Sequence, residues 1–203
     1  MKLYDAGRAP NPRRVRIFLA EKGLTIPLVA IDMAKMEHKS ADFTAKNPVQ
    51  RIPALELDDG TVISESVAIC RYFEETHPEP ALFGKSAKER AVIEMWNRRV
   101  ELGLFNSVAT AFRHSHPFMA EMEKPQISAW AEANRDKAID NLRMLDEQLS
   151  RHRFVTGEAY SIADITCQVA VDFMKLPKLS IPDDCINLIR WHGLVSARPS
   201  ASA

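Results

Sequence analysis

Two short segments of this sequence carry groups that could bind a ligand bearing both a carboxylate and an ammonium group. One is Ile52-Pro53, at the start of an apolar run, and the other is Ser64-Glu65-Ser66. Pro53 has no amide hydrogen, so it suits the first position of a strand or a bend that contains a cis bond. Such a bend would leave the backbone of Ile52 able to bond an extended ligand. Glu65 and Ser66 would add a carboxylate, a hydroxyl and free amides at a helix start.

A hairpin followed by a helix must position these groups. Ala54 to Leu57 is a short apolar run, and a turn at Asp58-Asp59-Gly60 leads from it to a second run, Thr61-Val62-Ile63. Ser64-Glu65-Ser66 then opens a predicted helix, Val67 to Glu75. Taken alone, the same pattern is also that of a plain hairpin and a capped helix without a ligand, so both interpretations stay open.

Pro53 before a strand, the acidic turn, the Glu65-Ser66 pair and the N-terminal strand at Leu3-Tyr4 together resemble the glutathione-binding half of the cytosolic glutathione transferases. The resemblance covers essentially the whole chain. In that family the proline is cis, the residue before it pairs with the peptide backbone of glutathione, and the Glu-Ser pair holds the γ-glutamyl end. Carried over position by position, the resemblance implies that glutathione is bound by Ile52, Pro53, Glu65 and Ser66.

Three basic residues carry weaker expectations from the same resemblance. Family members commonly contact the glycine carboxylate of glutathione from the region before the second helix, which here contains His38 and Lys39. Arg51, beside the proline motif, is a further candidate for this contact. Lysines and arginines at loop edges are usually just solvated, and that alternative applies here too.

The composition argues against several classes of protein. The 203 residues include 27 basic and 27 acidic side chains, and the zero net charge argues against nucleic acid or an anionic membrane as the main partner. No apolar run approaches the roughly 20 residues of a membrane span, and Met1 to Asp5 does not begin a signal peptide. Cys70, Cys167 and Cys185 are widely spaced without a CxxC pair. Neither a disulfide framework nor a zinc site is therefore expected, and a reducing cytoplasm is the default location.

The first eighty residues alternate short strands and helices in the order βαβαββα. Before the hairpin they are a strand, a helix that ends at Gly23, a second strand and a short helix: Lys2 to Asp5, Val15 to Lys22, Leu28 to Ile31 and Ser40 to Lys46. The pattern alone supports an α/β fold with a small sheet. By resemblance, residues 1–80 form a thioredoxin-like domain that binds glutathione. Thr76 to Pro80 breaks any helix and begins a plausible linker.

The second half of the sequence predicts only helices. Apolar residues step by four from Val92 to Phe112 along one long helix, and a similar series from Ile127 to Leu149 marks the next. A capping-box signature, Ser161 to Asp164, starts another, and by analogy it serves folding. Residues 86–203 are therefore expected to form an all-helical domain, which by resemblance provides the electrophile pocket. The tail, 196–201, is expected to be frayed.

The usual activator of the glutathione thiol is missing from its place. The ordinary pKa of a thiol lies near ~8.5, so an enzyme that uses glutathione must stabilise the thiolate. Many family members do so with a Tyr, Ser or Cys after the first strand, but the loop from Ala6 to Pro12 contains no Ser, Thr or Cys. Tyr4 is the only hydroxyl nearby, and its position inside the strand predicts packing instead.

The start of the first helix is one possible replacement for that activator. Asn11 as N-cap and Pro12 as the first helical residue predict a helix whose free amides point into the loop, where they would lower the pKa of a thiol. Arg13 and Arg14 would either add positive potential toward the thiolate or be solvated surface charges. For either residue alone, the solvated alternative is favoured.

The end of the long helix offers a second replacement, because Ser115, His114 and His116 lie there between two phenylalanines. The sequence resembles an unusual fungal and bacterial subgroup of the transferases, which lacks the Tyr, Ser or Cys and uses the first helix plus a water held by Ser and His from this region. By that resemblance, Ser115 with His114 or His116 holds the water. Alternatively, the histidines only favour the C-terminal end of their helix. Their spacing does not suit a helix-face metal site, and no metal is expected.

The resemblance implies that the glutathione thiolate attacks a hydrophobic electrophile, or reduces a hydroperoxide, in a cytoplasmic detoxifying enzyme that is usually a homodimer. Glutathione is then a co-substrate, and no cofactor is expected. The electrophile site is expected between the loop at Gly7 to Pro10, where Ala9 and Pro10 would line it, and the segment from Phe112 to Phe118. The main alternative, motivated by the bare loop, is a non-catalytic glutathione-binding or protein-interaction module of the same fold.

Overall fold

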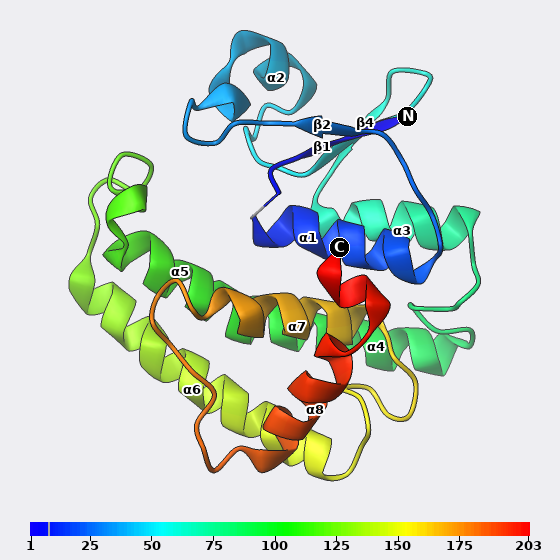
Figure 1. The fold of residues 1–203 in the computed structure, drawn as a ribbon, viewed down its shortest axis with the longest axis vertical. Coiled ribbons are helices and arrows are strands. Elements are labelled where there is room, and N and C mark those ends of the chain that lie inside the picture. The colour runs from blue at the N-terminus through cyan, green and yellow to red at the C-terminus, as the bar shows by residue number, and fades with distance from the viewer. Residues whose placement is uncertain (8) are drawn as a thin grey trace. The chain divides into compact units, whose positions relative to one another are not determined.

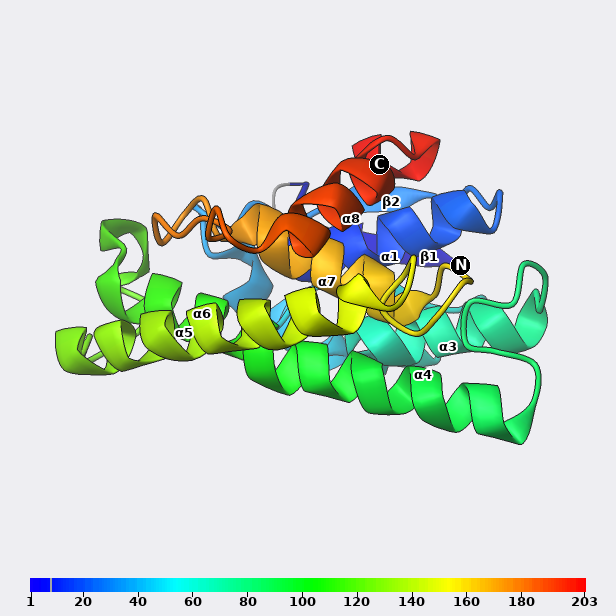
Figure 2. The same cartoon turned by 90° about the horizontal axis from the view of Figure 1, so that it is seen from below.

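The computed structural model describes residues 1–7 and 9–203 and divides the chain into two compact units. The first comprises Met1–Ala81 together with Pro199–Ala203, and the second comprises Leu82–Arg198. Figures 1 and 2 show a sheet with helices in the first unit and a set of helices in the second. The predicted fold class, an α/β thioredoxin-like part followed by a helical part, is confirmed.

The first unit contains a four-stranded sheet in the order β2-β1-β3-β4. β1 pairs with β2 in parallel and with β3 antiparallel, and β3 pairs antiparallel with β4. The element order matches the predicted βαβαββα with one added 3-10 turn, η1. The bounds are β1 Lys2–Asp5, α1 Pro10–Glu21, β2 Leu28–Ala30, η1 Glu37–Lys39, α2 Ala41–Lys46, β3 Ala54–Glu56, β4 Val62–Ser64 and α3 Ser66–Thr76.

Alternation along the strands divides the buried residues of this sheet between its two faces. Leu3 and Leu55 are register partners, and both are completely buried. The next register pair, Tyr4 and Ala54, points to the opposite face, because successive side chains of a strand alternate. There it packs in a cluster with Phe43 of α2 and Ile52. The residue before Pro53 is therefore anchored by its side chain in the core.

Two parallel helices, α1 and α3, lie side by side in this unit and are joined at both ends by buried polar contacts (Figure 1). At the C-terminal end, Lys22 Nζ lies 2.6 Å from Glu74 Oε2, and the lysine side chain is fully buried. Lys22 also donates to the carbonyl oxygens of His77 and Pro80, at 2.8 and 2.5 Å. A single side chain thus fixes the end of α3 and the segment that leaves it.

The C-terminal tail is ordered, so the expectation that residues 196–201 are frayed is wrong. α8 extends to Ser196, and a 3-10 turn, η4 Pro199–Ser202, packs against α1 as part of the first unit. Ser200 is buried and donates from its hydroxyl to Glu21, while Arg13 Nη2 donates to the carbonyl oxygen of Ala201 at 3.0 Å. These contacts over long sequence separations outweigh the local preference of a Ser- and Ala-rich tail for disorder.

The second unit is built from helices. The first long helix predicted there is continuous, but its hydrogen-bonding pattern changes along its length. Between α4 and α5 the backbone forms a π-helical segment, η2, and such segments add a residue per turn to an α-helix. A Cβ atom at Gly103 would lie 2.2 Å from Oδ1 of Asn141, so glycine allows the side chain of α6 to approach η2. The bounds are α4 Ala87–Arg99, η2 Val100–Phe105, α5 Asn106–Ser115, η3 Pro117–Met119, α6 Ser128–Ser150, α7 Ile162–Phe173 and α8 Ile186–Ser196.

α7 begins with the predicted capping box and forms the centre of the helical unit. Ser161 and Asp164 cap the helix reciprocally, and both side chains are completely buried. The Asp164 carboxylate also accepts hydrogen bonds from the amide of Val155 and the indole nitrogen of Trp191, both at 2.9 Å. Burial raises the pKa of Asp164 to about 6. The box therefore serves folding, as the sequence predicts.

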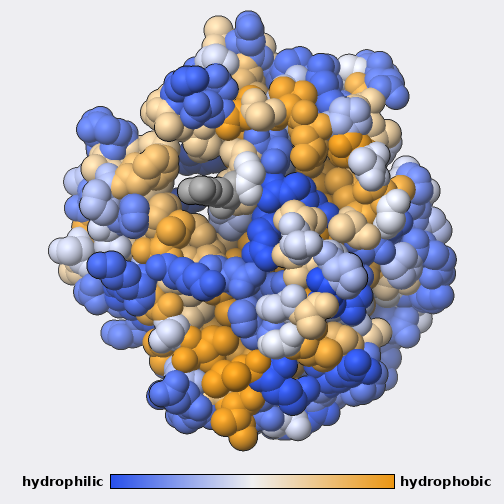
Figure 3. Space-filling view, viewed as in Figure 1, coloured by the Kyte–Doolittle hydropathy of each residue, from blue (hydrophilic) through white to orange (hydrophobic). Residues whose placement is uncertain are grey.

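The surface of the helical unit is mixed in character. Figure 3 shows an apolar area where α8 lies, and Ile186 and Ile189 of that helix are among the exposed large apolar residues.

Within residues 1–7 and 9–203, no helix combines the length and apolar character of a membrane span. The same residues contain no group of three or more His, Cys, Asp or Glu side chains arranged to hold a metal ion.

Candidate functional site

The proline motif adopts the geometry expected of it. The bond between Ile52 and Pro53 is cis, and both residues are buried. Pairing of β3 with β1 begins at Ala54, so the backbone of Ile52 lies outside the sheet ladder. Asn47, which is buried, donates from its side-chain amide to the carbonyl oxygen of Arg51 at 2.7 Å. The sequence analysis did not single out Asn47, although an Asn-Pro pair just before the motif is a recognisable turn signal.

Glu65 and Ser66 stand at the start of α3, one residue earlier than predicted. Glu65 is the N-cap residue with φ +66° and ψ 113°, a backbone conformation that is uncommon for a residue with a side chain. It is exposed, whereas Ser66, the first residue of the helix, is only 5% exposed. A carboxylate and a hydroxyl are thus brought to a helix N-terminus, where free amide groups favour anions.

Arg14 is completely buried, so the favoured expectation that it is a solvated surface charge is wrong. Its Nη1 donates a hydrogen bond to Oγ of Ser66 at 3.0 Å and links α1 to the start of α3. Arg13 is likewise held, by its bond to the tail carbonyl of Ala201. The available signal was the spacing of Arg14, Phe18 and Lys22 at every fourth position, which places all three on one face of the helix.

The first helix starts earlier than predicted, so Asn11 is not its N-cap. Ala9 occupies that position with extended backbone and no side-chain cap, and Pro10 is the first helical residue. Proline suits the first helical position, and Pro10, not Pro12, occupies it. Asn11 therefore lies within the first turn and is half-buried. Because prolines have no amide hydrogen, Asn11 carries the only N–H group among the first three residues of α1.

The loop before α1 is held from the helix itself. Arg16 lies 2.5 Å from a carboxylate oxygen of Asp5, at the end of β1, and donates to the carbonyl oxygen of Gly7 at 2.7 Å. The amide of Ala9 donates to the carbonyl oxygen of Ala6 at 2.7 Å and closes a turn. Arg16 thus ties α1 to the end of β1, a contact that the sequence does not predict.

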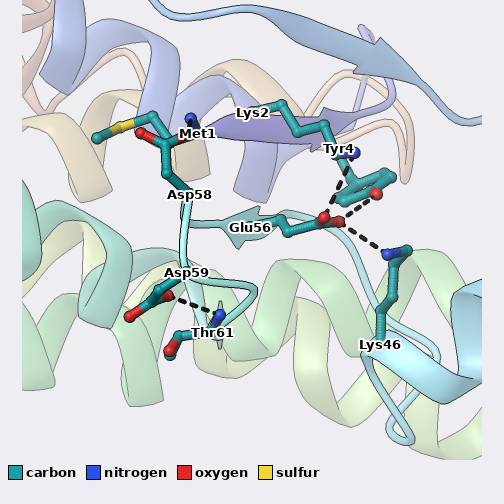
Figure 4. Close-up of polar contacts among 8 residues, drawn as sticks. All are labelled: Met1, Lys2, Tyr4, Lys46, Glu56, Asp58, Asp59 and Thr61. Atoms are coloured by element: carbon teal, nitrogen blue, oxygen red, sulfur yellow. Dashed lines mark hydrogen bonds and ion pairs between the residues drawn. The ribbon is translucent and has the colours of Figure 1, made fainter.

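Tyr4 packs inside the sheet, as its position predicts, and its hydroxyl is used there. The hydroxyl donates to Glu56 Oε2 at 2.6 Å, and Lys46 Nζ lies 2.8 Å from the same oxygen (Figure 4). Lys2 completes the group at 3.4 Å from the other carboxylate oxygen. Hydrogen bonds from Lys46 and Tyr4 lower the pKa of Glu56 to about 2. This network stabilises the sheet, and the Tyr4 hydroxyl is engaged in it.

His38, Lys39 and Arg51 form a basic group with very different exposures. The imidazole of His38 is completely buried in η1, and within the described residues neither ring nitrogen has a hydrogen-bond partner. Lys39 and Arg51 are exposed. Burial, followed by the positive charges of Lys39 and Arg51, lowers the pKa of His38. Lys39 and Arg51 can therefore reach an anion from solvent, whereas His38, which was expected beside them as a ligand contact, has no exposed surface.

His114 and His116 stabilise the connection between α5 and α6, and Ser115 bonds within α5. Ser115 donates from its hydroxyl to the carbonyl oxygen of Ala111 at 2.6 Å. His114 Nδ1 accepts from the amide of Ile127, and His116 Nδ1 accepts from the amide of Phe118, both at 3.2 Å. In each neutral histidine the proton must therefore be on Nε2. These bonds are a structural role, but not the electrostatic one at the helix end that the sequence suggests, and they leave Nε2 of His116 as a donor.

Comparisons with known proteins agree with this arrangement. Residues 9–76 match the model of the glutathione S-transferase N-terminal domain, and residues 109–199 match that of the C-terminal domain. Glutathione S-transferase 2 of Saccharomyces cerevisiae is 39% identical over 203 residues, which cover 98% of this chain and 87% of the relative. This chain belongs to the glutathione S-transferase family. It is an enzyme of that family.

Solved transferase structures have the same fold over nearly the whole length. A glutathione S-transferase domain-containing protein from Marinobacter aquaeolei is 41% identical with a TM-score of 0.95, and the match covers 98% of this chain and 99% of that one. Gtt2 from Saccharomyces cerevisiae is 39% identical with a TM-score of 0.95, over 100% of this chain and 99% of the other.

The residues expected to bind the electrophile lie in both units of this transferase. Ala9 and Pro10 are half-buried at the start of α1. In the helical unit, Phe112 stacks on His116 at a centroid distance of 4.9 Å and packs edge-on against Phe173 at 5.2 Å. Phe118 is 51% exposed in η3. Phe173 was not expected to be part of this cluster, because the sequence gives no sign that the end of α7 reaches α5.

Proposed function

We propose that this transferase joins the thiolate of glutathione to hydrophobic electrophiles. The thiolate attacks an electrophilic carbon and forms a carbon–sulfur bond. It then either displaces a leaving group as an anion or adds to an activated double bond, whose carbanion takes up a proton. The proposal rests mainly on the backbone of Ile52, which lies outside the sheet ladder, and on Glu65 and Ser66, which stand at the start of α3 in the same unit.

Glutathione is held along its length in this proposal. The backbone of Ile52, presented by Pro53, pairs with the cysteinyl part of the peptide. The carboxylate of Glu65 receives the γ-glutamyl ammonium group, and the hydroxyl of Ser66 receives the α-carboxylate. At the other end, the exposed side chains of Lys39 and Arg51 bind the glycine carboxylate, and His38, which is buried in η1, supports the segment from which Lys39 extends.

Activation of the thiol is assigned to Asn11 in the first turn of α1, whose N–H group can donate to a thiolate. Ser115, with His114 or His116, is the second candidate, as the group that holds an activating water. The bond from Phe118 to His116 Nδ1 supports this role, because it leaves Nε2 as a donor while the oxygen of Ser115 can still accept.

The two parts of the chain have separate tasks in this proposal. Residues 1–80 bind glutathione. Residues 86–203 contact the electrophile with the apolar side chains of Phe112 and Phe118, and Ala9 and Pro10 of the first part contact it as well. A hydroperoxide is the alternative electrophile, and assays with both substrate types would show which one dominates.

We also propose a homodimer in the cytoplasm. Met95 on α4 and Leu102 on η2 are large apolar residues that are 40% and 59% exposed, which favours a partner surface there. The three cysteines are free and buried, as is usual in a reducing compartment. Light scattering after size exclusion should give twice the mass of the chain, and Leu102→Glu should shift it toward the monomer.

The experiment that tests the proposed function is an ultraviolet difference titration of thiolate absorbance, with glutathione added to the pure protein between about pH 5 and pH 9. We expect a thiolate signal well below the pKa of the free thiol, and turnover with an aromatic halide. Binding of glutathione without that signal would instead support a non-catalytic module. Absence of binding would refute the proposed glutathione site.

A further inference from the structure

Arg14 is a permanently charged side chain in an interior position. Its exposed fraction is 0%, and a guanidinium group does not lose its proton in proteins. Burying a charge costs free energy unless hydrogen bonds and nearby charges offset the lost hydration. The bond from Nη1 to Oγ of Ser66, at 3.0 Å, is one of the contacts that offset the lost hydration of this cation.

This bond determines what the hydroxyl of Ser66 can do. A serine hydroxyl has one hydrogen to donate and lone pairs that accept. Arg14 can only donate, so it occupies a lone pair of Ser66 Oγ and leaves the hydroxyl hydrogen for another acceptor. Ser66 is also the first residue of α3, where the amide groups of the first turn point outward. Each of these features favours a carboxylate as the acceptor.

The charge of Arg14 also acts on the neighbouring turn of α3. Burial raises the pKa of the Cys70 thiol to about 12, and the positive charge of Arg14 opposes that increase. A charge that reaches Cys70 also reaches an anion at the start of the helix, because Ser66 is the residue that Arg14 contacts directly. Little screening by solvent is expected for a group with no exposed surface.

We infer that Arg14 is a positioning residue for the α-carboxylate at the γ-glutamyl end of glutathione. Arg14 orients the Ser66 hydroxyl as a donor and adds a fixed positive charge behind it, so that this end of the site selects a carboxylate over an uncharged group. This inference rests on the proposed function, since it assumes that Ser66 contacts glutathione.

The same pair of helices provides a matched control. Lys22, the C-cap residue of α1, is also a buried cation in contact with α3, through Glu74, but it lies at the opposite end of the helices from Ser66. A purely structural role for Arg14 predicts that Arg14→Met and Lys22→Met have similar consequences. The inference predicts that both lower the melting temperature but only the first changes ligand discrimination.

The test compares two ligands by calorimetry: glutathione, and its analogue with an amide in place of the γ-glutamyl α-carboxylate. The wild type should bind glutathione at least about tenfold more tightly than the amide, as expected for charge-assisted hydrogen bonds. That ratio should fall toward one in Arg14→Met and Ser66→Ala, and the double variant should lose no more than Arg14→Met alone. Lys22→Met should keep the wild-type ratio. Arg14→Gln, which keeps a side-chain N–H donor but removes the charge, is the replacement if Arg14→Met does not fold, and its ratio should fall at least about threefold.

A wild-type ratio in folded Arg14→Met or Arg14→Gln would overturn the inference and leave the proposed function intact. Losses that multiply in the double variant would overturn it as well, because they would show that Arg14 does not act through Ser66. Failure of the wild type to bind glutathione would instead refute the proposed function, and the inference with it.

Discussion

Lys22 and Glu74 form a buried ion pair, with Nζ and Oε2 at 2.6 Å, and the two residues have the same sequence separation as Arg14 and Ser66, 52 positions. Arg14 and Lys22 lie eight residues apart on one face of α1, and their partners lie eight residues apart on α3. The two helices are therefore parallel and fixed in register at both ends. One contact lies at the N-terminal ends, where the candidate ligand groups are. The other lies where the chain leaves the domain.

The first prediction concerns the stability of this pair. Lys22→Met removes the cation that lies 2.6 Å from the buried carboxylate of Glu74, and removal of one partner from a buried pair typically costs about 3–5 kcal/mol. We expect a lower free energy of unfolding by that order in urea denaturation. The double variant Lys22→Met/Glu74→Leu should recover most of the loss, because neither charge of this pair then stays buried. Equal losses in the single and double variants would contradict this account.

The second prediction concerns the pH dependence that Asp164 gives to stability. Its pKa is raised from 3.8 to about 6 in the folded protein, so between these values the folded state holds a proton that the unfolded state has lost. Stability should therefore fall as the pH rises from about 4 to 6, by about 3 kcal/mol, and then level off. Asp164→Asn removes this titration. It should flatten that part of the profile of unfolding free energy against pH, although it also weakens the cap.

Parallel profiles for the wild type and Asp164→Asn would contradict that prediction. They would mean that the donors to this carboxylate, from Ser161, Val155 and Trp191, hold its pKa near the ordinary value in spite of burial.

Much of the fold follows from local sequence signals. The order of strands and helices, the turn after β3 and the capping box of α7 all depend on residues within a few positions of one another, and all agree with the structure. The cis bond before Pro53 was expected from the family resemblance, whereas the residues alone left it open.

The rest depends on contacts between distant positions. Arg14 looks like a surface residue until Ser66 is placed beside it, and the tail looks disordered until Ser200 meets Glu21, 179 positions away. The start of α1 was misplaced for a different reason. Pro10 and Pro12 both suit the first helical position, and no local signal distinguishes them.

The third prediction separates the backbone of Asn11 from its side chain. Asn11→Ala removes the side chain but keeps the N–H group, and Asn11→Pro removes the N–H group at a first-turn position that tolerates proline. If the helix start stabilises the thiolate, the pKa of bound glutathione should stay low in Asn11→Ala. It should rise by up to about one unit in Asn11→Pro, the size of a helix-terminus effect. Thiolate absorbance measures both, and an equal shift in the two variants would point to the side chain.

The fourth prediction tests whether His116 contributes to turnover beyond its structural role. His116→Asn keeps an acceptor for the amide of Phe118, because asparagine is a good N-cap residue, but it removes the Nε2–H donor. We expect kcat to fall about tenfold, in the range of a lost catalytic hydrogen bond, with little change in KM for glutathione or in melting temperature. Ser115→Ala should lower kcat similarly. Its melting temperature should also change little, because the bond from Ser115 to Ala111 lies within the helix. An unchanged kcat in Ser115→Ala, in His116→Asn and in a variant with Ser115, His114 and His116 all replaced would show that these residues have only structural roles. Activation would then rest on the start of α1.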